Sequence, residues 1–385
     1  MKFLHLGDLH IGKSLYEFDL IEDQRYIFNQ IIEIAVDKKV DGILIAGDVY
    51  DKTIPSENAV RLFDYFLCQL EAKKLKTFII SGNHDSDERL NFGSSLFESK
   101  GVYISSKFNG KLYKREFEDP NGKVNVYLLP YVTGSQVKHF YPDEKIDNYN
   151  DAVKAIIKRA NINTDERNIL VAHQFVGGKE KLPNLAGSEG VAVQNVGTVE
   201  IISSECFDDF DYVALGHIHS GQSVGREEVR YSGSPLKYSL SEIDDDKSVP
   251  IITFGQKGKV DIEFVELKPL RNLRHIKGKL NVVLNDDNIS DEDDYIYMTL
   301  TDEDFVNDAI GIVRQYYKNT VKLNFENSYT KENQQLDIKD VAENKPFNEV
   351  ISDFYHQVYG CEINDEELGI MLEIAREVGV VYETN

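Results

Sequence analysis

The stretch Ile43-Leu44-Ile45-Ala46-Gly47-Asp48-Val49-Tyr50-Asp51 places a short apolar run directly before a glycine and two carboxylates. Such a run is typical of a buried strand, and a glycine lets the chain turn sharply where the strand ends. In open α/β sheets, ligands bind at the carboxyl ends of strands. The stretch therefore predicts an α/β fold that carries functional side chains at a strand end.

The same pattern recurs four times along the chain, each time with an apolar run before a polar motif. The four motifs are Gly7-Asp8-Leu9-His10, Gly82-Asn83-His84-Asp85, Ala172-His173 and Gly216-His217-Ile218-His219. In Asp8-x-His10 and His217-x-His219, the two-residue step of an extended chain places both side chains on one face. Five of the nine histidines lie in these motifs, so chance is a poor explanation, and we expect one metal site built from several strand ends.

The residue types restrict the metal. Carboxylate, imidazole and carboxamide groups suit manganese, iron or zinc better than calcium. A structural zinc-finger pattern is excluded because Cys68, Cys206 and Cys361 all lie outside the motifs. Seven candidate ligands are too many for one tetrahedral ion but fit two ions that share a carboxylate. Paired ions about 3.5–4 Å apart are used for phosphoester hydrolysis.

The ordered series D-x-H, G-D-x-x-D, G-N-H-D, H and G-H-x-H resembles the signature of the calcineurin-like metallophosphoesterases. The stretches Gly7 to Lys13, Ile54 to Ser56 and Tyr231 to Ser239 are further similar to the SbcD nuclease family, whose members work with a coiled-coil ATPase. This resemblance implies a DNA nuclease that uses two divalent ions, most readily Mn²⁺, with Mg²⁺ as the alternative. It implies a ligand set of Asp8, His10, Asp48 and His219 for one ion and Asp48, Asn83, His173 and His217 for the other, with Asp48 bridging.

The resemblance also implies in-line attack by activated water, without a covalent enzyme intermediate. His84 would stabilise or protonate the leaving oxygen, and Asp51 would orient His84 and favour its protonated form. Two neighbours allow alternatives. We expect Asp85 to cap the next helix rather than to support the site, and Lys13 either contacts a substrate phosphate or is simply exposed.

At 385 residues, the chain exceeds the size at which one core stops growing, so two or three domains are expected. Residues 1–270 alternate strand-like and helical runs, and the family implies a four-layer α/β/β/α sandwich. Two helical stripes fit its outer layers. They are Ile27, Phe28, Ile31, Ile32 and Ala35, and then Val60, Phe63, Leu67 and Leu70.

Residues 271–330 predict a small α+β capping domain with strands at Leu280–Leu284, Tyr295–Thr301 and Val321–Phe325 and a helix at Phe305–Tyr317. A polar linker follows at residues 331–345. Residues 346–385 predict two amphipathic helices, the second capped by Asn364. By resemblance these helices dock on the ATPase partner; packing on each other or on the main domain is the equal alternative.

Composition agrees with an enzyme that is not secreted. Gly7-Asp8 comes too early for the apolar stretch of a signal peptide, no run is long enough to span a bilayer, and the three cysteines suggest free thiols, so we expect a cytoplasmic protein. The net charge of -23 should repel nucleic acid, so DNA would be held by the metals, by local basic residues or by a partner.

We therefore expect a manganese-dependent nuclease, acting as a 3′ to 5′ exonuclease on duplex ends and an endonuclease on hairpins or single strands. The resemblance implies that it works with an SbcC-type ATPase and as a homodimer within a heterotetramer. The chain has no Gly-x-x-x-x-Gly-Lys-Ser/Thr loop, so any ATP dependence must come from another subunit. The main alternative is a phosphatase or phosphodiesterase acting on nucleotides or phosphoproteins. The second is a non-catalytic scaffold, which the complete set of candidate ligands disfavours.

Overall fold

The computed structural model describes residues 1–178, 182–185, 201–285, 289–304, 306–328, 347–359 and 363–377. The chain divides into two units. The first comprises Met1–Arg274 with Asp293–Tyr297, and the second comprises His275–Glu292 with Met298–Asn385.

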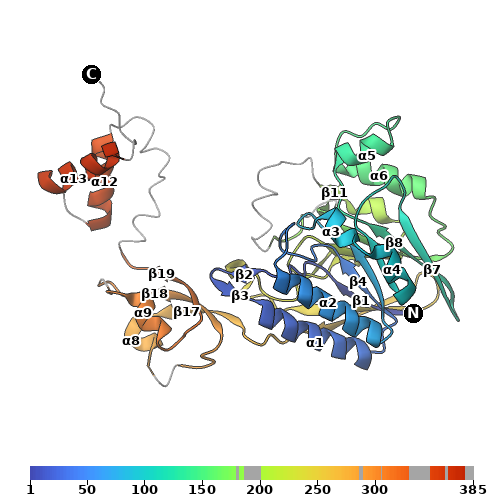
Figure 1. Cartoon of the computed structure of the whole chain (residues 1–385), viewed down its shortest axis with the longest axis horizontal. Helices are drawn as coiled ribbons and strands as arrows, with labels where there is room; N and C mark the ends of the chain where they lie inside the picture. Colours follow the sequence, from blue (N-terminus) through green and yellow to red (C-terminus); the bar gives the residue numbers. More distant parts are fainter. Residues whose placement is uncertain are drawn as a thin grey trace. The chain divides into compact units, whose positions relative to one another are not determined.

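The first unit contains two six-stranded sheets (Figure 1). The first sheet has the order β16-β15-β1-β4-β5-β6, and its last four strands are parallel. Its strands are β1 Lys2–Leu6, β4 Gly42–Ala46, β5 Lys76–Ile80, β6 Val102–Ser105, β15 Ser248–Phe254 and β16 Val260–Glu266. Because β1, β4 and β5 run in the same direction, the loops that follow them lie at one edge of the sheet.

The second sheet has the order β13-β14-β12-β9-β8-β7, and β14, β12, β9 and β8 are parallel. Its strands are β7 Tyr113–Asp119, β8 Gly122–Leu129, β9 Arg167–His173, β12 Tyr212–Gly216, β13 Gln222–Val224 and β14 Arg226–Tyr231. Ile169 and Val171 face the core between the two sheets, whereas Leu170 and Ala172 face a second core on the other side. This alternation buries both faces of the sheet.

Helices form the two outer layers. Helices α1 Ile21–Asp37 and α2 Glu57–Ala72 pack together through stacked rings of Phe28 and Phe66, 4.5 Å apart, and α2 contacts β5. Helix α6 Tyr149–Ala160 joins the outer core of the second sheet, as does Val137 of α5 Gly134–Phe140. The expected α/β/β/α sandwich is therefore confirmed.

Short elements complete the first unit. They are β2 Ser14–Leu15, β3 Phe18–Asp19, α3 Asp87–Asn91, α4 Ser94–Phe97, η1 Glu98–Lys100, β10 Val176–Gly177, β11 Ile202–Ser203, η3 Ser204–Phe207 and η4 Leu240–Glu242.

The apolar stripe expected on α1 is confirmed, because all five of its residues are buried. The stripe expected on α2 is partly wrong. Phe63 and Leu70 are buried, but Val60 is 46% exposed. The buried face instead follows the helical spacing of Ala59, Leu62, Phe63, Phe66 and Leu70, so the smaller Ala59 takes the inward position of the first turn.

A three-stranded sheet follows, in the order β17-β18-β19. Its strands are β17 Leu273–Gly278, β18 Tyr295–Leu300 and β19 Thr320–Phe325. The strand expected at Leu280–Leu284 is wrong, because Leu280–Val283 forms the short helix α8. The first strand of this sheet lies instead at β17, whose sequence Leu-Arg-His-Ile-Lys-Gly is mostly polar and contains no apolar run typical of a strand. The expected long helix is the shorter α9, Ala309–Arg314, and Phe305 lies outside the described residues.

Both expected C-terminal helices are present, as α12 Phe347–Tyr359 and α13 Asp365–Glu377. They contact each other, and the Tyr355 hydroxyl donates to Glu367 Oε2 at 2.9 Å. Asn364 caps α13 by accepting from the Glu367 backbone N–H at 2.9 Å. The linker expected at residues 331–345 lies outside the described residues. Among the described helices, none combines the length and apolar character that crossing a bilayer requires.

Candidate metal centre

Five strand ends bring the seven candidate ligands to one edge of the two sheets. Asp8 and His10 follow β1, Asp48 follows β4, Asn83 follows β5, His173 ends β9, and His217 and His219 follow β12. Residues that contact each other between these loops lie up to 209 positions apart in the sequence. The sandwich itself therefore gathers the motifs.

Asp48 lies between two groups of side chains. Its Oδ2 is 3.6 Å from His10 Nε2 on one side and 3.4 Å from His173 Nε2 on the other. In the first group, His10 Nε2 lies 3.1 Å from His219 Nε2, and donor atoms of Asp8, His10 and His219 lie within 4.8 Å of one another. Asp48 is thus placed where a shared carboxylate would be.

The second group centres on Asn83. Its Oδ1 is 3.0 Å from both His173 Nε2 and His217 Nδ1. His173 Nδ1 donates to the Ala46 carbonyl at 2.8 Å, which fixes the ring and turns Nε2 toward Asn83 and Asp48. The two groups together supply the mixed oxygen and nitrogen donors of a two-metal site.

The backbone is strained at four of the seven positions. The φ angles of Asp8, His10, Asp48 and His217 are 53°, 42°, 48° and 105°, in the left-handed region that side chains other than glycine rarely adopt. Hydrogen bonds between loops stabilise this strained backbone. One of them runs from the His10 N–H to the Asp48 carbonyl, at 2.9 Å. Such outliers cluster at functional sites, where the surrounding fold determines them.

Two motif glycines allow the loops to approach. A Cβ on Gly216 would lie 1.9 Å from the Ala46 carbonyl oxygen and 2.8 Å from His173 Nδ1. A Cβ on Gly82 would lie 2.1 Å from Asp48 Oδ1. Glycine is therefore required at these positions for close packing of the ligand loops, beyond the sharp turn that the sequence suggested.

Burial and mutual interaction shift the protonation equilibria of the candidate ligands in different directions. Burial opposes ionisation of Asp48, but the charge and hydrogen bond of His173 outweigh it and hold the pKa of Asp48 below its usual value. Burial likewise opposes protonation of His173, yet Asp48 and then Asp8 raise the pKa of His173 to about 9. Burial raises the pKa of Asp8 to about 6, and burial together with the charge of His173 lowers the pKa of His217 to about 3.

Unsatisfied atoms support the fit to cations. Asp8 Oδ2 and His10 Nδ1 are buried and have no hydrogen-bond partner among the described residues. A buried polar atom without a partner costs about 1–3 kcal/mol, so its retention calls for an explanation. A cation beside Asp8 Oδ2 would remove that cost, and the residues present therefore fit a dimetal site.

His84 lies at the mouth of the centre. Its backbone N–H donates to Asp48 Oδ1 at 2.9 Å, and its ring packs edge-on against His10 at 4.9 Å. Its Nδ1 donates to the backbone carbonyl of Asp51 at 2.9 Å. The Asp51 carboxylate instead accepts from Lys13 Nζ at 2.7 Å. The contact expected between Asp51 and His84 is therefore made by the main chain, and Lys13, being paired, is only 20% exposed.

The expectation that Asp85 caps the next helix is wrong. Its carboxylate accepts from the backbone N–H groups of Val49, Tyr50 and Gly82 at 2.9–3.0 Å, whereas Ser86 occupies the N-cap position of α3. Asp85 therefore ties the loop after β4 to the loop after β5. A carboxylate that follows a ligand motif can satisfy loop N–H groups as readily as helix N–H groups, and the sequence does not distinguish the two.

Sequence reasoning missed Glu242, a fully buried carboxylate. Its Oε1 accepts from His219 Nδ1 at 3.3 Å, and its Oε2 accepts from the buried Lys247 Nζ at 2.6 Å. Hydroxyls of Ser234 and Ser239 complete its contacts. Burial opposes ionisation of Glu242, but His219 and Lys247 lower its pKa to about 2. The arrangement turns His219 Nε2 toward His10 in the centre. An isolated Glu in the stretch Ser239 to Glu242 carries no motif signal.

Gln24 and Tyr238 were also missed. Gln24 Nε2 donates to the His10 carbonyl at 2.7 Å, and the Tyr238 hydroxyl donates to the Leu9 carbonyl at 2.5 Å. The Tyr238 ring meets His10 and His219 edge-on, at 5.7 and 6.0 Å. Both residues brace the first motif from helix α1 and from the stretch after the last histidines.

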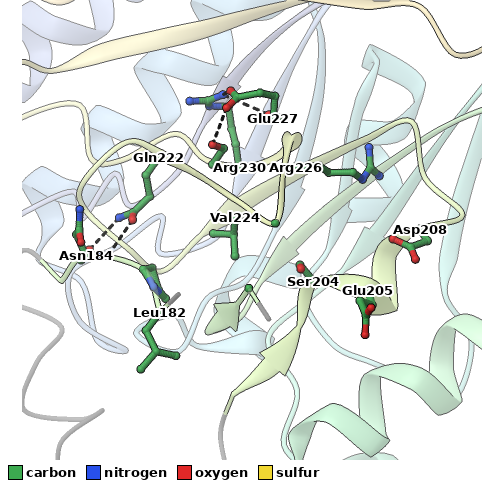
Figure 2. A pocket seen from close by; sticks show the side chains of 14 residues that line it. Leu182, Asn184, Ser204, Glu205, Asp208, Gln222, Val224, Arg226, Glu227 and Arg230 are labelled. Carbon is green, nitrogen blue, oxygen red and sulfur yellow. Dashed lines mark hydrogen bonds and ion pairs between the residues drawn. The ribbon is translucent and has the colours of Figure 1, made fainter. Parts of the chain in front are cut away.

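A cavity of about 810 Å³ lies beyond the centre, beside the β13–β14 hairpin (Figure 2). In Figure 2, Arg230 contacts Glu227, and Gln222 contacts Asn184 through two hydrogen bonds of 2.8 Å. Arg226 is occupied by Glu228 and the carbonyls of Phe207 and Phe210. The cavity contains none of the candidate ligands, so it is not the reaction centre.

Comparisons with protein families and with solved structures give several matches to this chain. The family model described as "Calcineurin-like phosphoesterase" matches residues 1–221, and the model SbcD_C, described as "Type 5 capsule protein repressor C-terminal domain", matches residues 269–359. Among solved structures, the chain is similar to a dimetal phosphatase from Danio rerio, at 12% identity and a TM-score of 0.40, over 69% of this chain and 96% of that one. It is also similar to the protein TT1561 of Thermus thermophilus, at 13% identity and a TM-score of 0.38, over 68% and 98%.

Proposed function

The chain belongs to the calcineurin-like phosphoesterase family, and on that premise we propose that it is the nuclease subunit of an SbcCD-type complex. It is a hydrolase of phosphoesters, and the proposed substrate is the phosphodiester backbone of DNA. The observation that carries the proposal is the pairing, in one chain, of a complete His/Asp centre with an SbcD_C match at residues 269–359. Residues 271–330 would form the capping domain that shapes the DNA path.

The proposed ligands follow the two groups of side chains. Asp48 would be shared between both ions, because among the described carboxylates it alone lies within 3.6 Å of both His10 and His173. The remaining ligands are Asp8, His10 and His219 for one ion and Asn83, His173 and His217 for the other. Two divalent ions, proposed as Mn²⁺ with Mg²⁺ as the alternative, would supply Lewis acidity that activates water for attack on phosphorus.

The protein's own groups orient the reaction. The Asp51 carbonyl fixes the His84 ring by accepting from Nδ1, which leaves Nε2 as the atom available to a substrate. We assign to His84 the stabilisation or protonation of the leaving oxygen, a role that typically contributes about 10²–10⁴ in rate. Asp51 is a positioning residue, since its main chain holds His84 and its carboxylate holds Lys13 beside the centre.

The proposed partner is an SbcC-type ATPase. Helices α12 and α13 contact each other, yet Ile370, Met371 and Ile374 on α13 are 41–54% exposed. An apolar stripe on a helix that already has one neighbour suits a second helical partner. We propose that residues 346–385 dock on the base of the coiled coil, and that the linker at 331–345 joins them to the capping domain.

We further propose a homodimer within the complex. Phe92 and Leu96, in the segment of α3 and α4 that follows His84, are 83% and 76% exposed. Large apolar side chains in such exposed positions mark interaction surfaces. The free thiols of Cys68 and Cys206 fit a reducing compartment, and we propose the cytoplasm.

A nuclease assay on blunt duplex and hairpin DNA, with manganese or magnesium and with or without the ATPase, tests the proposal. We expect 3′ to 5′ degradation of duplex ends and cleavage at hairpins, both stimulated by the ATPase and abolished by chelation. The same preparation should hydrolyse p-nitrophenyl and cyclic-nucleotide esters much more slowly. The reverse preference would identify a phosphatase or small-molecule phosphodiesterase, and a metal-loaded protein inert on every substrate would identify a scaffold.

A further inference from the structure

A second cavity, of about 440 Å³, lies on the outer face of the second sheet. Its walls come from the segment that enters β7, from β8, from the end of α5 and from the last turns of α6. It is lined by Gly110, Lys111, Leu112, Lys114, Tyr127, Tyr141, Ile156, Arg159 and Ala160. Three lining residues are basic and none is acidic.

That composition is unusual in this chain, whose acidic residues outnumber its basic ones by 66 to 43. Four other cavities in the described part of the chain each have at least three carboxylates in their lining. A basic pocket on a protein of net charge -23 cannot be explained by overall charge. It is a local departure that favours an anion.

Aromatic rings hold two of the cations in place. The Lys114 ammonium lies 5.6 Å from the ring centroid of Tyr127, and the Arg159 guanidinium lies 4.2 Å from that of Tyr141. Both tyrosine rings are buried, at 3% and 4% exposure, so they serve as platforms for the cations rather than for a ligand. Such cation–π contacts orient the side chains before an anion arrives.

The entrance is fixed as well. The Tyr141 hydroxyl donates to the Gly110 carbonyl at 3.0 Å, and Gly110 has a φ of 88°. Lys111, the next residue, is exposed and has no ion pair with a described carboxylate. Lys114 and Arg159 each contact a carboxylate outside the lining, Glu116 and Glu144, whereas Lys111 is fully available.

The cavity lies close to the level of the metal centre. Lys114 pairs with Tyr127, and Tyr127 pairs with Leu170, three residues before His173 on β9. At about 3.3 Å per residue, the separation along the strand is about 10 Å. Because β7 lies two strands from β9, about 10 Å across the sheet is added, so the phosphate held here would lie several nucleotides from the one at the metals.

We propose that this cavity is an accessory phosphate-binding site, outside the metal centre, that holds a backbone phosphate of the nucleic-acid substrate. The choice of a nucleic acid as the source of the phosphate rests on the proposed function. The affinity for phosphate does not, because it follows from the three cations, the aromatic platforms and the absence of lining carboxylates. The carboxyl end of α6 opposes an anion, but a single charge-assisted hydrogen bond is stronger than this helix-end effect.

The test uses the full chain without metal, so that binding is measured in the absence of cleavage. Variants are Lys111→Ala, whose exposed side chain has no structural role, and the double variant Lys111→Ala/Lys114→Ala. Lys145→Ala is the matched control, because Lys145 is 87% exposed and lies outside the cavity. The two ligands are a labelled single-stranded oligonucleotide, followed by fluorescence anisotropy at several salt concentrations, and inorganic phosphate alone, followed by calorimetry.

We expect Lys145→Ala to bind the oligonucleotide and inorganic phosphate with the same affinities as the wild type. Lys111→Ala should lower the salt dependence of oligonucleotide binding by about 0.7 in log–log slope, and the double variant by about 1.4. Hydrolysis of bis-p-nitrophenyl phosphate with manganese should be unchanged in every variant, because so small an ester contacts the metal centre alone.

The proposal would be overturned if the heat of phosphate binding were equal in the wild type and the double variant, or if the wild type showed no heat of phosphate binding. Oligonucleotide binding that both lysine variants retain in full would do the same. A different result separates the two hypotheses: if phosphate binding depends on Lys111 and Lys114 but no form binds or cleaves nucleic acid, the anion site stands and the nuclease function fails.

Discussion

Replacement of Glu242 by glutamine tests whether the metal centre depends on a carboxylate that is not a ligand. Glutamine keeps the volume but removes the charge from a fully buried position. Lys247, only 9% exposed, then loses a partner 2.6 Å away. Breaking a buried ion pair costs about 3–5 kcal/mol, and because Asp245 stays 3.5 Å from Lys247, we expect the lower end, about 3 kcal/mol.

The same substitution acts on His219. A glutamine can present either its oxygen or its amide N–H to Nδ1, so the ring is no longer held in one orientation with Nε2 toward the centre. Loss of such an outer carboxylate typically weakens metal binding about 10–100-fold. We expect this loss only for the ion that we propose Asp8, His10, Asp48 and His219 to hold, since the Ala46 carbonyl holds His173 independently.

Urea unfolding of the metal-free protein measures the loss of stability, and calorimetric titration with manganese measures the loss of metal affinity. The double variant Glu242→Gln/Lys247→Met should recover much of the stability, because both charges are then gone, but not the metal affinity. Glu57→Gln, at a carboxylate that is 89% exposed and whose partner Arg61 is also exposed, is the control and should change neither appreciably. If Glu242→Gln binds both manganese ions with wild-type affinity, Glu242 does not position His219.

Four further predictions follow from the structure. His84→Ala should keep both metals, measured by calorimetry, and lose about 10²–10⁴ in cleavage rate; an inactive variant that has also lost metal would refute its role. Gly216→Ala should cost about 1–3 kcal/mol in urea unfolding and weaken metal binding, because its Cβ would lie 1.9 Å from the Ala46 carbonyl, whereas Gly369→Ala, with open space around it, should be neutral or stabilising. The Arg167 guanidinium, buried and paired with Asp119, holds the pKa of that carboxyl below its usual value, so the pair's contribution is present above about pH 4 and is lost as the pH falls further. The difference in unfolding free energy between wild type and Asp119→Asn should accordingly be largest near neutrality and shrink below about pH 4; a constant difference would contradict this. Deletion of residues 346–385 should abolish copurification with the ATPase while leaving manganese binding intact, and undiminished copurification would end the docking hypothesis.

The layers of the sandwich and the convergence of the motifs could be predicted from the sequence. Short apolar runs that end at Gly7, Gly47, Gly82 and Gly216 fixed where strands stop, and parallel strands that stop at one edge must present their next residues together. The periodicity of α1 was equally clear, because Phe28 and its neighbours leave no alternative buried face. On α2, Val60 and Ala59 are both apolar, and only packing against β5 and α1 selects Ala59.

Contacts that depend on the fold were not predictable. Asp85 and Glu242 are ordinary acidic residues in sequence, and their partners Val49 and His219 lie 36 and 23 positions away. The prediction of the strands in the small three-stranded sheet was partly wrong for a different reason. Leu280–Leu284 is apolar enough for a strand, but the Lys279 carbonyl accepts the first hydrogen bonds of a helical turn there. The sequence of β17 is too polar to predict a strand.

The left-handed backbone at Asp8, His10, Asp48 and His217 has a consequence for ion selectivity. A framework held in so unfavourable a shape by neighbouring loops has little freedom to widen. Calcium prefers six to eight oxygen ligands at about 2.3–2.6 Å and would need such widening, whereas smaller transition ions do not. We therefore expect the proposed centre to reject calcium through the stiffness of its backbone as well as through its donor atoms.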